Sequence, residues 1–317
     1  MRLGVVFPGQ GSQRVGMGGG IVAAYPAAAD LFRRAERVLG YDLYAVISRG
    51  PEETLRETVY AQPAIYVTNY ALAACAGESL PVVASAGHSF AEFCSLTLAG
   101  ALTFEDALTL VRERGLAMQE AAEKSPGAMA AILGLDVAGI RLATTAAGDV
   151  GRVCLANFNT PEQSVISGDA AAVARACELA LAGGAKRVVP LNVSGAWHSA
   201  LMAPARTRFA PFVERAPIAL PRFTVISNID AEPYRDVATI RANLVRSVTD
   251  EVLWHDTSLR LVAEGLDGIV EFGGSAVLAP MLKRVEGAPK PVHVGDESGL
   301  EKLAASLTPS LAPSVQA

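Results

Sequence analysis

The sequence predicts an α/β protein in which a mostly parallel sheet is interrupted by a small inserted domain. Short apolar runs alternate with helical segments at both ends of the chain, which is typical of a parallel sheet covered by helices. One apolar run ends in a sharp strand-to-helix turn at residues 82–93. Residues 125–192, between the two alternating regions, follow a different order of elements.

Composition excludes several classes of protein. Of 317 residues, 51% are hydrophobic and 19% are charged, so we expect a substantial folded core. A net charge of −5 argues against nucleic-acid binding, because phosphate contacts need a basic surface. No run of about 18 apolar residues predicts a membrane span. Four scattered cysteines without a C-x-x-C pair indicate reduced, buried thiols and no metal site.

The chain begins with a predicted buried strand, Leu3–Phe7, which leaves no room for a signal peptide, so we expect a cytoplasmic protein. The strand ends in the glycine-rich loop 8–13. Such loops form the binding sites of open α/β sheets, although an ordinary connecting loop fits the pattern equally well. The spacing matches neither a P-loop nor a dinucleotide fingerprint. Helices are expected over 27–39, from Pro51, and over 61–76.

Residues 82–93 predict a nucleophile elbow, in which a buried strand turns into a helix and exposes a serine. The usual pattern is G-x-S-x-G, and here Gly87 and Ser89 fill the first two fixed positions. Ala91 replaces the second glycine, so the motif alone indicates only a generic serine enzyme. An elbow on a parallel sheet predicts an α/β-hydrolase-like large domain. The elbow is followed by a predicted helix over 104–122, capped by Thr103.

The inserted region reads as β-α-β-β-α-β, the order of a ferredoxin-like unit. We therefore expect a small domain over 125–192, a discontinuous large domain over 1–124 and 193–305, and a flexible tail over 306–317. Within the insertion, strands are predicted over 128–135, 153–159, 163–167 and 186–191, and helices over 137–147 and 170–181. Beyond it, helices are predicted over 204–215, 238–248, 257–263 and 277–283, and strands over 225–228 and 268–272.

A serine nucleophile needs a base within hydrogen-bond reach, and histidine is the usual choice near neutral pH. His198 follows an apolar stretch and a tight turn, so it can project into the same cleft, although a structural role fits the sequence equally well. His88 lies beside Ser89 and is expected to point away from it. His255 and His293 lie at a helix start and in a strand near the end of the chain.

Acyl transfer also needs two N–H donors for the oxyanion. The residue after the nucleophile, Phe90, supplies one in elbow enzymes, and the loop 9–11 is a candidate for the other. A buried arginine would suit a substrate with a free carboxylate. Arg112 and Arg114 occupy different sides of the helix after the elbow, and spacing alone favours two solvated side chains.

Together these motifs resemble the malonyl-CoA:acyl carrier protein transacylases. The matches run in order from about residue 3 to 285 and cover both predicted domains. They are Phe7-Pro-Gly-Gln-Gly-Ser-Gln13, Gly87-His-Ser-Phe-Ala-Glu92, Arg114 with Met118-Gln119, Gly127-Ala-Met-Ala-Ala131, Asn157-Phe-Asn159, Ala185-Lys-Arg187, His198-Ser-Ala-Leu-Met202 and Asn228-Ile-Asp230.

The resemblance implies that malonyl passes from coenzyme A to a serine, and then to the phosphopantetheine thiol of an acyl carrier protein, in fatty-acid or polyketide synthesis. It implies that Ser89 is the nucleophile and His198 its base. The main-chain N–H groups of Gln10 and Phe90 would form the oxyanion hole, and Arg114 would bind the malonyl carboxylate. We expect no resident cofactor, no metal, no membrane or nucleic-acid partner, and a monomer.

Further residues enter through the resemblance alone. Asn157 and Asn159 are expected to line the cleft from the small domain. Trp197 is bulky, which in related polyketide acyltransferases goes with unsubstituted malonyl. Ala91 is expected to affect packing more than chemistry. Leu253 stands where many members have glutamine, and its main-chain carbonyl is expected to orient the histidine.

Two alternatives remain open. One is a trans-acting polyketide-synthase acyltransferase of other acyl specificity, or an editing acyl hydrolase, with the same fold and serine. The other is a non-catalytic module that docks a carrier protein. A hydrolase that clears uncharged acyl groups gains nothing from an arginine, so Arg114 favours transfer. An acidic carrier would fit a basic rim, for which the candidates are Lys186, Arg187, Lys283 and Arg284.

Overall fold

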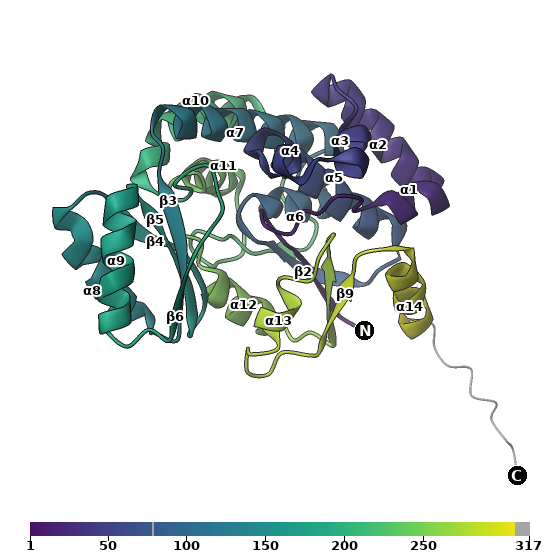
Figure 1. The fold of residues 1–317 in the computed structure, drawn as a ribbon. Helices are drawn as coiled ribbons and strands as arrows, with labels where there is room; N and C mark the ends of the chain where they lie inside the picture. The colour runs from purple at the N-terminus through teal and green to yellow at the C-terminus, as the bar shows by residue number, and fades with distance from the viewer. Residues whose placement is uncertain (78, 308–317) are drawn as a thin grey trace, which may run out of the picture.

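The computed structural model describes residues 1–77 and 79–307. Its larger part is built on a five-stranded sheet (Figure 1). The strands lie in the order β7-β2-β1-β8-β9, and each neighbouring pair is parallel, as the sequence predicts. They are β1 (Leu3–Phe7), β2 (Val82–Gly87), β7 (Thr224–Val225), β8 (Gly268–Phe272) and β9 (Pro291–Val294).

Helices cover both faces of this sheet. Helices α2, α5, α6 and α7 pack on one face, and α12 and α13 pack on the other. The helices of this part are α1 (Gly19–Ala24), α2 (Pro26–Leu39), α3 (Leu43–Arg49), α4 (Glu52–Arg56), α5 (Thr58–Cys75), α6 (Glu92–Leu98), α7 (Phe104–Lys124), α10 (Ala203–Arg215), α11 (Val237–Arg246), α12 (Trp254–Val262), α13 (Ala279–Leu282) and α14 (Glu297–Leu307).

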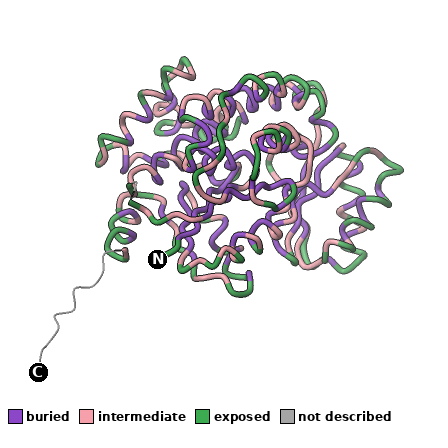
Figure 2. Tube along the Cα trace, turned by 180° about the vertical axis from the view of Figure 1, so that it is seen from behind, coloured by how far each residue is buried: buried purple, intermediate pink, exposed green. Residues whose placement is uncertain are grey.

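Strand β1 shows why the sheet needs cover on both sides. Successive side chains of a strand point to opposite faces. Val5 and Phe7 join the core formed with α2, α5 and α7, whereas Val6 joins the core around Trp254. All three side chains are fully buried, so the strand is apolar throughout instead of alternating with polar residues. Figure 2 shows this buried centre and the exposed outer turns.

A second sheet has four antiparallel strands in the order β4-β5-β3-β6 (Figure 1). Its strands alternate with two helices in the order β-α-β-β-α-β, which confirms the predicted succession. The boundaries agree within a few residues. The elements are β3 (Ala128–Leu133), α8 (Val137–Ala146), β4 (Val153–Thr160), β5 (Gln163–Gly168), α9 (Ala170–Ala182) and β6 (Arg187–Pro190).

The two faces of this small sheet have different neighbours. Ala130 and Ile132 pack beneath α8 and α9 in a separate small core. Met129 and Ala131, on the opposite face, join the core of the larger part and line its main cavity. The small sheet therefore supplies one wall of that cavity.

Several sequence predictions need correction. Strand β7 ends at Val225; the N–H of Ile226 still donates to the carbonyl of Ser85 in β2, and the chain leaves the sheet after it. The predicted tail starts too early, since α14 continues to Leu307; residues 308–317 lie outside the described part. Helices α1, α3 and α14 were not predicted. Of the four free cysteines, only Cys94 is buried. Within the described ranges, no helix has the length and apolar character to span a membrane.

Candidate active site

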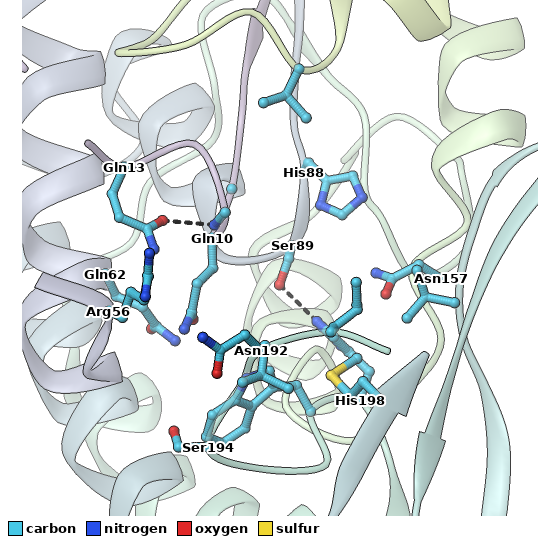
Figure 3. A pocket seen from close by; sticks show the side chains of 18 of the residues that line it. Gln10, Gln13, Arg56, Gln62, His88, Ser89, Asn157, Asn192, Ser194 and His198 are labelled. Carbon is cyan, nitrogen blue, oxygen red and sulfur yellow. Dashed lines mark hydrogen bonds between the residues drawn. The ribbon is translucent and has the colours of Figure 1, made fainter. Parts of the chain in front are cut away.

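A cavity of about 770 Å³ lies between the carboxyl ends of the parallel strands and the inner face of the small sheet. Its lining comes from segments far apart in the sequence (Figure 3). The residues that the sequence singled out gather there: Gln10, Ser89, Arg114, Asn157, Asn159, Trp197 and His198. Phe90 lies beside Ser89 in the turn, and Leu253 is not part of the lining.

The elbow has the backbone geometry that its sequence predicts. Ser89 has a φ of 55°, a left-handed conformation that side-chain-bearing residues rarely adopt. A Cβ atom at Gly87 would lie 2.1 Å from the carbonyl oxygen of Ala91, so this position requires glycine. Ala91 has a φ of −65° and its methyl group is buried in the core. An alanine at the second glycine position therefore introduces no backbone strain.

Ser89 and His198 form a hydrogen-bonded pair. The distance between Ser89 Oγ and His198 Nε2 is 2.8 Å, and His198 Nδ1 lies 3.0 Å from the main-chain carbonyl of Asp250. A carbonyl can only accept, so Nδ1 carries the proton and Nε2 is free to accept from the serine hydroxyl. This corrects one expectation, because the carbonyl of Leu253 instead accepts from the N–H of Thr257 at the start of α12.

The surroundings keep His198 neutral. Burial lowers its pKa most, and the positive charge of Arg114 and the neighbouring His88 lower it further, to about 3. An exposed imidazole titrates near 6.5. The base form of His198 is therefore available throughout the physiological pH range.

Arg114 reaches the cavity from α7, and the prediction of a solvated side chain is wrong for it. The residue is 1% exposed, and its Nη2 donates to the carbonyl of Ser247 at 3.2 Å. Its buried Nε has no hydrogen-bond partner among the described residues. Arg112 does lie near the surface, where it contacts Glu113 and the carbonyl of Val38. A buried guanidinium with an unused donor suits an anionic ligand.

Burial lowers the pKa of Arg114 to about 9, although the nearby carboxyl of Glu92 opposes this shift. The guanidinium remains charged near neutral pH. Gln62, which the sequence analysis missed, also lines the cavity, and its buried Oε1 has no hydrogen-bond partner in the part of the chain that the structure describes. Both side chains therefore have unsatisfied polar atoms that a bound ligand can satisfy.

The loop after β1 packs directly against the elbow. The N–H of His88 donates to the carbonyl of Phe7 at 2.9 Å. A Cβ atom at Gly9 would lie 2.6 Å from the carbonyl of His88, so this close approach needs glycine. The side chain of Gln10 is turned toward Thr58, to which its Nε2 donates at 3.3 Å. Gln10 is thereby fixed at the edge of the cavity next to the elbow.

The remaining histidines lie away from the serine. His88 Nε2 is 3.0 Å from Asn159 Oδ1, a contact that turns its ring toward the small sheet. His255 packs edge-on to Phe158, and His293 Nε2 donates to the carbonyl of Gly273 at 2.8 Å. None of the three contacts Ser89 Oγ, in agreement with the choice of His198 from the sequence.

Asn157 lines the cavity from β4 of the inserted region, and Trp197 lines it from the segment that follows this region. Asn157 pairs with Val252 through a β-bridge, which ties β4 to the segment that follows Asp250. Trp197 directly precedes His198 and is 5% exposed. Among the described residues, no group of three or more His, Cys, Asp or Glu side chains is placed to hold a metal ion.

Comparison with known proteins identifies the family. The model of the acyl transferase domain matches residues 5–291. The malonyl CoA-acyl carrier protein transacylase of Haemophilus influenzae is 39% identical over 298 residues, which are 93% of this chain and 96% of the relative. The chain belongs to the malonyl-CoA:acyl carrier protein transacylase family.

Solved structures of this family have the same fold. A malonyl-transacylase in complex with its type II polyketide synthase acyl carrier protein superimposes with a TM-score of 0.92 at 36% identity, over 96% of this chain and 100% of that chain. An acyl carrier protein S-malonyltransferase from Vibrio cholerae gives 0.90 at 36% identity, with the same coverage of both chains. The mixed α/β architecture with a parallel sheet is therefore shared by these transacylases.

Besides Gln62, four residues around this transacylase site were missed as contributors: Glu92, Asn228, Tyr234 and Asp250. Glu92 and Asn228 lie in motifs that carry the family resemblance. They are far apart in the sequence, so nothing in it indicates that they contact each other. Both are buried, at 2% and 0% exposure, and they contact each other across the elbow. Asp250 acts through its main chain, which leaves no signature in side-chain chemistry.

Proposed function

We propose that this protein transfers a malonyl group from malonyl-CoA to Ser89 and then to the phosphopantetheine thiol of an acyl carrier protein. One observation carries this proposal: the Ser89–His198 pair shares its cavity with a buried arginine that has an unused donor. The pair suits acyl transfer, and the arginine suits an acyl group with a carboxylate. The names of the relatives support the same substrate and acceptor.

The geometry supports a two-step exchange. His198 Nε2 takes the proton of Ser89 Oγ as the oxygen attacks the thioester carbonyl. The main-chain N–H groups of Gln10 and Phe90 stabilise the oxyanion, and its collapse expels the coenzyme A thiolate, which takes the proton from His198. In the second step His198 deprotonates the carrier thiol, the thiolate attacks the malonyl ester, and Ser89 recovers its proton as it leaves.

Arg114 determines which acyl group is accepted. Its guanidinium binds the malonyl carboxylate with charge-assisted hydrogen bonds, and the buried Nε supplies a donor for this purpose. A malonyl group fixed at both ends excludes water from the ester and leaves it for the thiol. Trp197 narrows the cavity next to His198, which favours unsubstituted malonyl.

The architecture supports the same assignment. Residues 1–124 and 193–305 form an α/β-hydrolase-like large domain, and residues 125–192 form a ferredoxin-like small domain. The antiparallel order β4-β5-β3-β6 with both helices on one face supports the second part. Asn157 and Asn159 line the substrate cleft from this domain. The protein acts in the cytoplasm as a monomer without a resident cofactor.

The carrier protein docks on a basic rim made of Lys186, Arg187, Lys283 and Arg284, all of them exposed. Arg284 follows α13 and forms an ion pair at 3.6 Å with Glu162 in the turn between β4 and β5. The N–H of Gly134 donates to the carbonyl of Glu162, and that of Lys186 to the carbonyl of Leu133. These contacts support a single rim across the mouth of the cavity, on which an acidic carrier fits.

Labelling with radioactive malonyl-CoA tests the proposal. Wild-type protein is expected to retain one malonyl group, Ser89→Ala none, and the label should pass to an acyl carrier protein that carries phosphopantetheine. Rapid loss of the label to water without a carrier would instead indicate an editing hydrolase. Unlabelled wild-type protein, or equal labelling of both proteins, contradicts the proposed transfer.

A further inference from the structure

A buried amide side chain holds the elbow from the side opposite the substrate. Asn228 Oδ1 accepts from the N–H of Ser89 at 3.1 Å, and Nδ2 donates to the carbonyls of Gly87 at 2.7 Å and Ser89 at 3.2 Å. A single side chain therefore satisfies both main-chain groups of the nucleophile. It does so where Ser89 has the unfavourable φ of 55°.

Glu92 fixes the orientation of this amide. Its Oε2 accepts from the main-chain N–H of Asn228 at 2.8 Å and from Nδ2 at 2.6 Å, so the two Nδ2 hydrogens are shared among three oxygen atoms. Its Oε1 accepts from the hydroxyl of Tyr234. An amide rotated by 180° would bring Oδ1 against three oxygen atoms. The carboxyl group therefore selects the orientation in which Nδ2 faces the carbonyl of Ser89.

This contact determines where the N–H of Phe90 points. The Ser89–Phe90 peptide is trans, because the cis bond of the described chain is Gly50–Pro51. In a trans peptide the C=O and N–H groups point in opposite directions. The carbonyl of Ser89 is held by Asn228 Nδ2 and by the N–H of Glu92, so the N–H of Phe90 points away from both.

The strand order shows what lies on that opposite side. Strand β2, which carries the elbow, lies between β7 and β1. Asn228 follows β7, whereas Gln10 follows β1. A Phe90 N–H directed away from Asn228 therefore faces the loop of Gln10, which supplies the other oxyanion donor in the proposed mechanism.

We propose that Asn228, oriented by Glu92, is a positioning residue that aims the N–H of Phe90 at the developing oxyanion. Neither side chain touches the substrate. The inference rests on the proposed malonyl transfer and identifies what keeps its oxyanion hole assembled. Without this amide, the Ser89–Phe90 peptide is free to rotate toward a relaxed conformation, and the N–H leaves the position where negative charge develops.

The test measures malonylation of Ser89 in single turnovers of the Asn228→Ala variant. The isosteric variant Asn228→Asp, which keeps the shape of the side chain, is measured as well and replaces the alanine variant if that one does not fold. Asn243→Ala is the matched control. Asn243 is equally buried and holds the same 227–230 loop through Ser227 Oγ and Asp230, but it makes no hydrogen bond to the elbow. Melting temperature, the rate constant and its dependence on malonyl-CoA and on pH are recorded for each variant.

Both Asn228 variants are expected to acylate about 10- to 100-fold more slowly, because removal of a complete oxyanion donor lowers rates by about 100- to 1,000-fold. Half-saturation by malonyl-CoA and the pH profile should stay near wild type, since Arg114 and His198 are unchanged. Asn243→Ala should lose stability but acylate within about threefold of wild type. This change is smaller than the slowing of about 10- to 100-fold expected for the Asn228 variants.

Two results overturn the positioning role: folded Asn228 variants that acylate as fast as Asn243→Ala, or a loss confined to substrate affinity. Failure of the wild-type protein to become malonylated is a separate outcome, which rejects the proposed function itself.

Discussion

In the proposed mechanism Arg114 has two effects, one on the acyl group and one on the base. Its charge faces the cavity as a site for a carboxylate, and the same charge helps to lower the pKa of His198 to about 3. A cation beside a buried imidazole disfavours the imidazolium form, so the base stays neutral before substrate arrives. Malonyl bound in the proposed way would neutralise that cation. Its carboxylate would therefore make His198 more basic at the moment when proton transfer is required.

This arrangement predicts the behaviour of Arg114→Ala. Malonyl transfer should fall by about 100- to 1,000-fold, because the carboxylate loses a charged partner inside a buried site. Acetyl transfer, which has no carboxylate to bind, should change by less than about tenfold and approach the malonyl rate. Matched acyl-CoA assays measure the ratio, and Arg112→Ala serves as the control on the same helix. An equal loss for both acyl groups contradicts the carboxylate role.

Residue spacing showed that Arg112 and Arg114 lie on different sides of helix α7. It did not show which of the two points into the protein. Helix α7 is buried over most of its surface, so amphipathic periodicity does not mark a single inner face. The carbonyl that orients His198 was likewise misplaced by three residues. That contact depends on how 247–253 folds back against β4, and no side chain records it. Local motifs made Ser89 and His198 candidates, and the family resemblance assigned their roles; the contacts around them depend on tertiary structure.

At the level of elements, helix α6 begins directly after the elbow with a buried carboxyl group, that of Glu92. Burial raises the pKa of Glu92 to about 7, despite the hydrogen bonds from Tyr234 and Asn228. In the unfolded chain the same carboxyl titrates near 4.5. Between these values the folded protein binds more protons than the unfolded chain, so its stability declines as pH rises through this window.

Glu92→Gln should remove that decline. Relative to wild type, the variant is expected to gain up to about 3 kcal/mol of unfolding free energy between pH 4 and pH 8, whatever its stability at pH 4. Denaturant unfolding at several pH values measures the difference. Glu113→Gln, on the neighbouring helix α7, provides a buried carboxyl for comparison. A constant difference between Glu92→Gln and wild type across this range would show that folding does not shift the pKa of Glu92, and would contradict the prediction.

The elements themselves were largely predictable. Strand β1, the elbow and the six elements of the inserted region lie within a few residues of their predicted positions, because each has a clear apolar period and glycine or proline at its ends. Helices α1 and α3 are short and are held by packing against α2 and α5, so propensity alone did not mark them. Strand β7 is short because the chain turns away after Ile226, and the N–H of Asn228 donates to Glu92.

At the scale of the molecule, the cavity exists because the inserted sheet faces the carboxyl ends of the parallel strands. Met129, Ala131 and Val165 turn away from α8 and α9 and line the cavity instead. The proposed basic rim spans the same gap: Arg284 comes from the large sheet's side, and its ion-pair partner Glu162 from the small sheet's side. A carrier protein bound on this rim therefore touches both walls of the cavity that its phosphopantetheine arm must enter.

Charge reversal at Arg284 tests this docking site. The ion pair with Glu162 is exposed on both sides, so its loss should change stability by less than about 1 kcal/mol. Arg284→Glu should raise KM for the carrier protein about tenfold at low salt, and high salt should reduce the difference. KM for malonyl-CoA and the amount of malonylated Ser89 should not change.

Arg175→Glu is the matched control, because Arg175 lies exposed on α9, whose buried face packs on the side of the small sheet away from the cavity. If this control weakens carrier binding as much as Arg284→Glu, total charge governs the encounter. If neither variant changes KM for the carrier at low salt, the carrier docks elsewhere, and the rim across the two sheets has no part in the second half of the reaction.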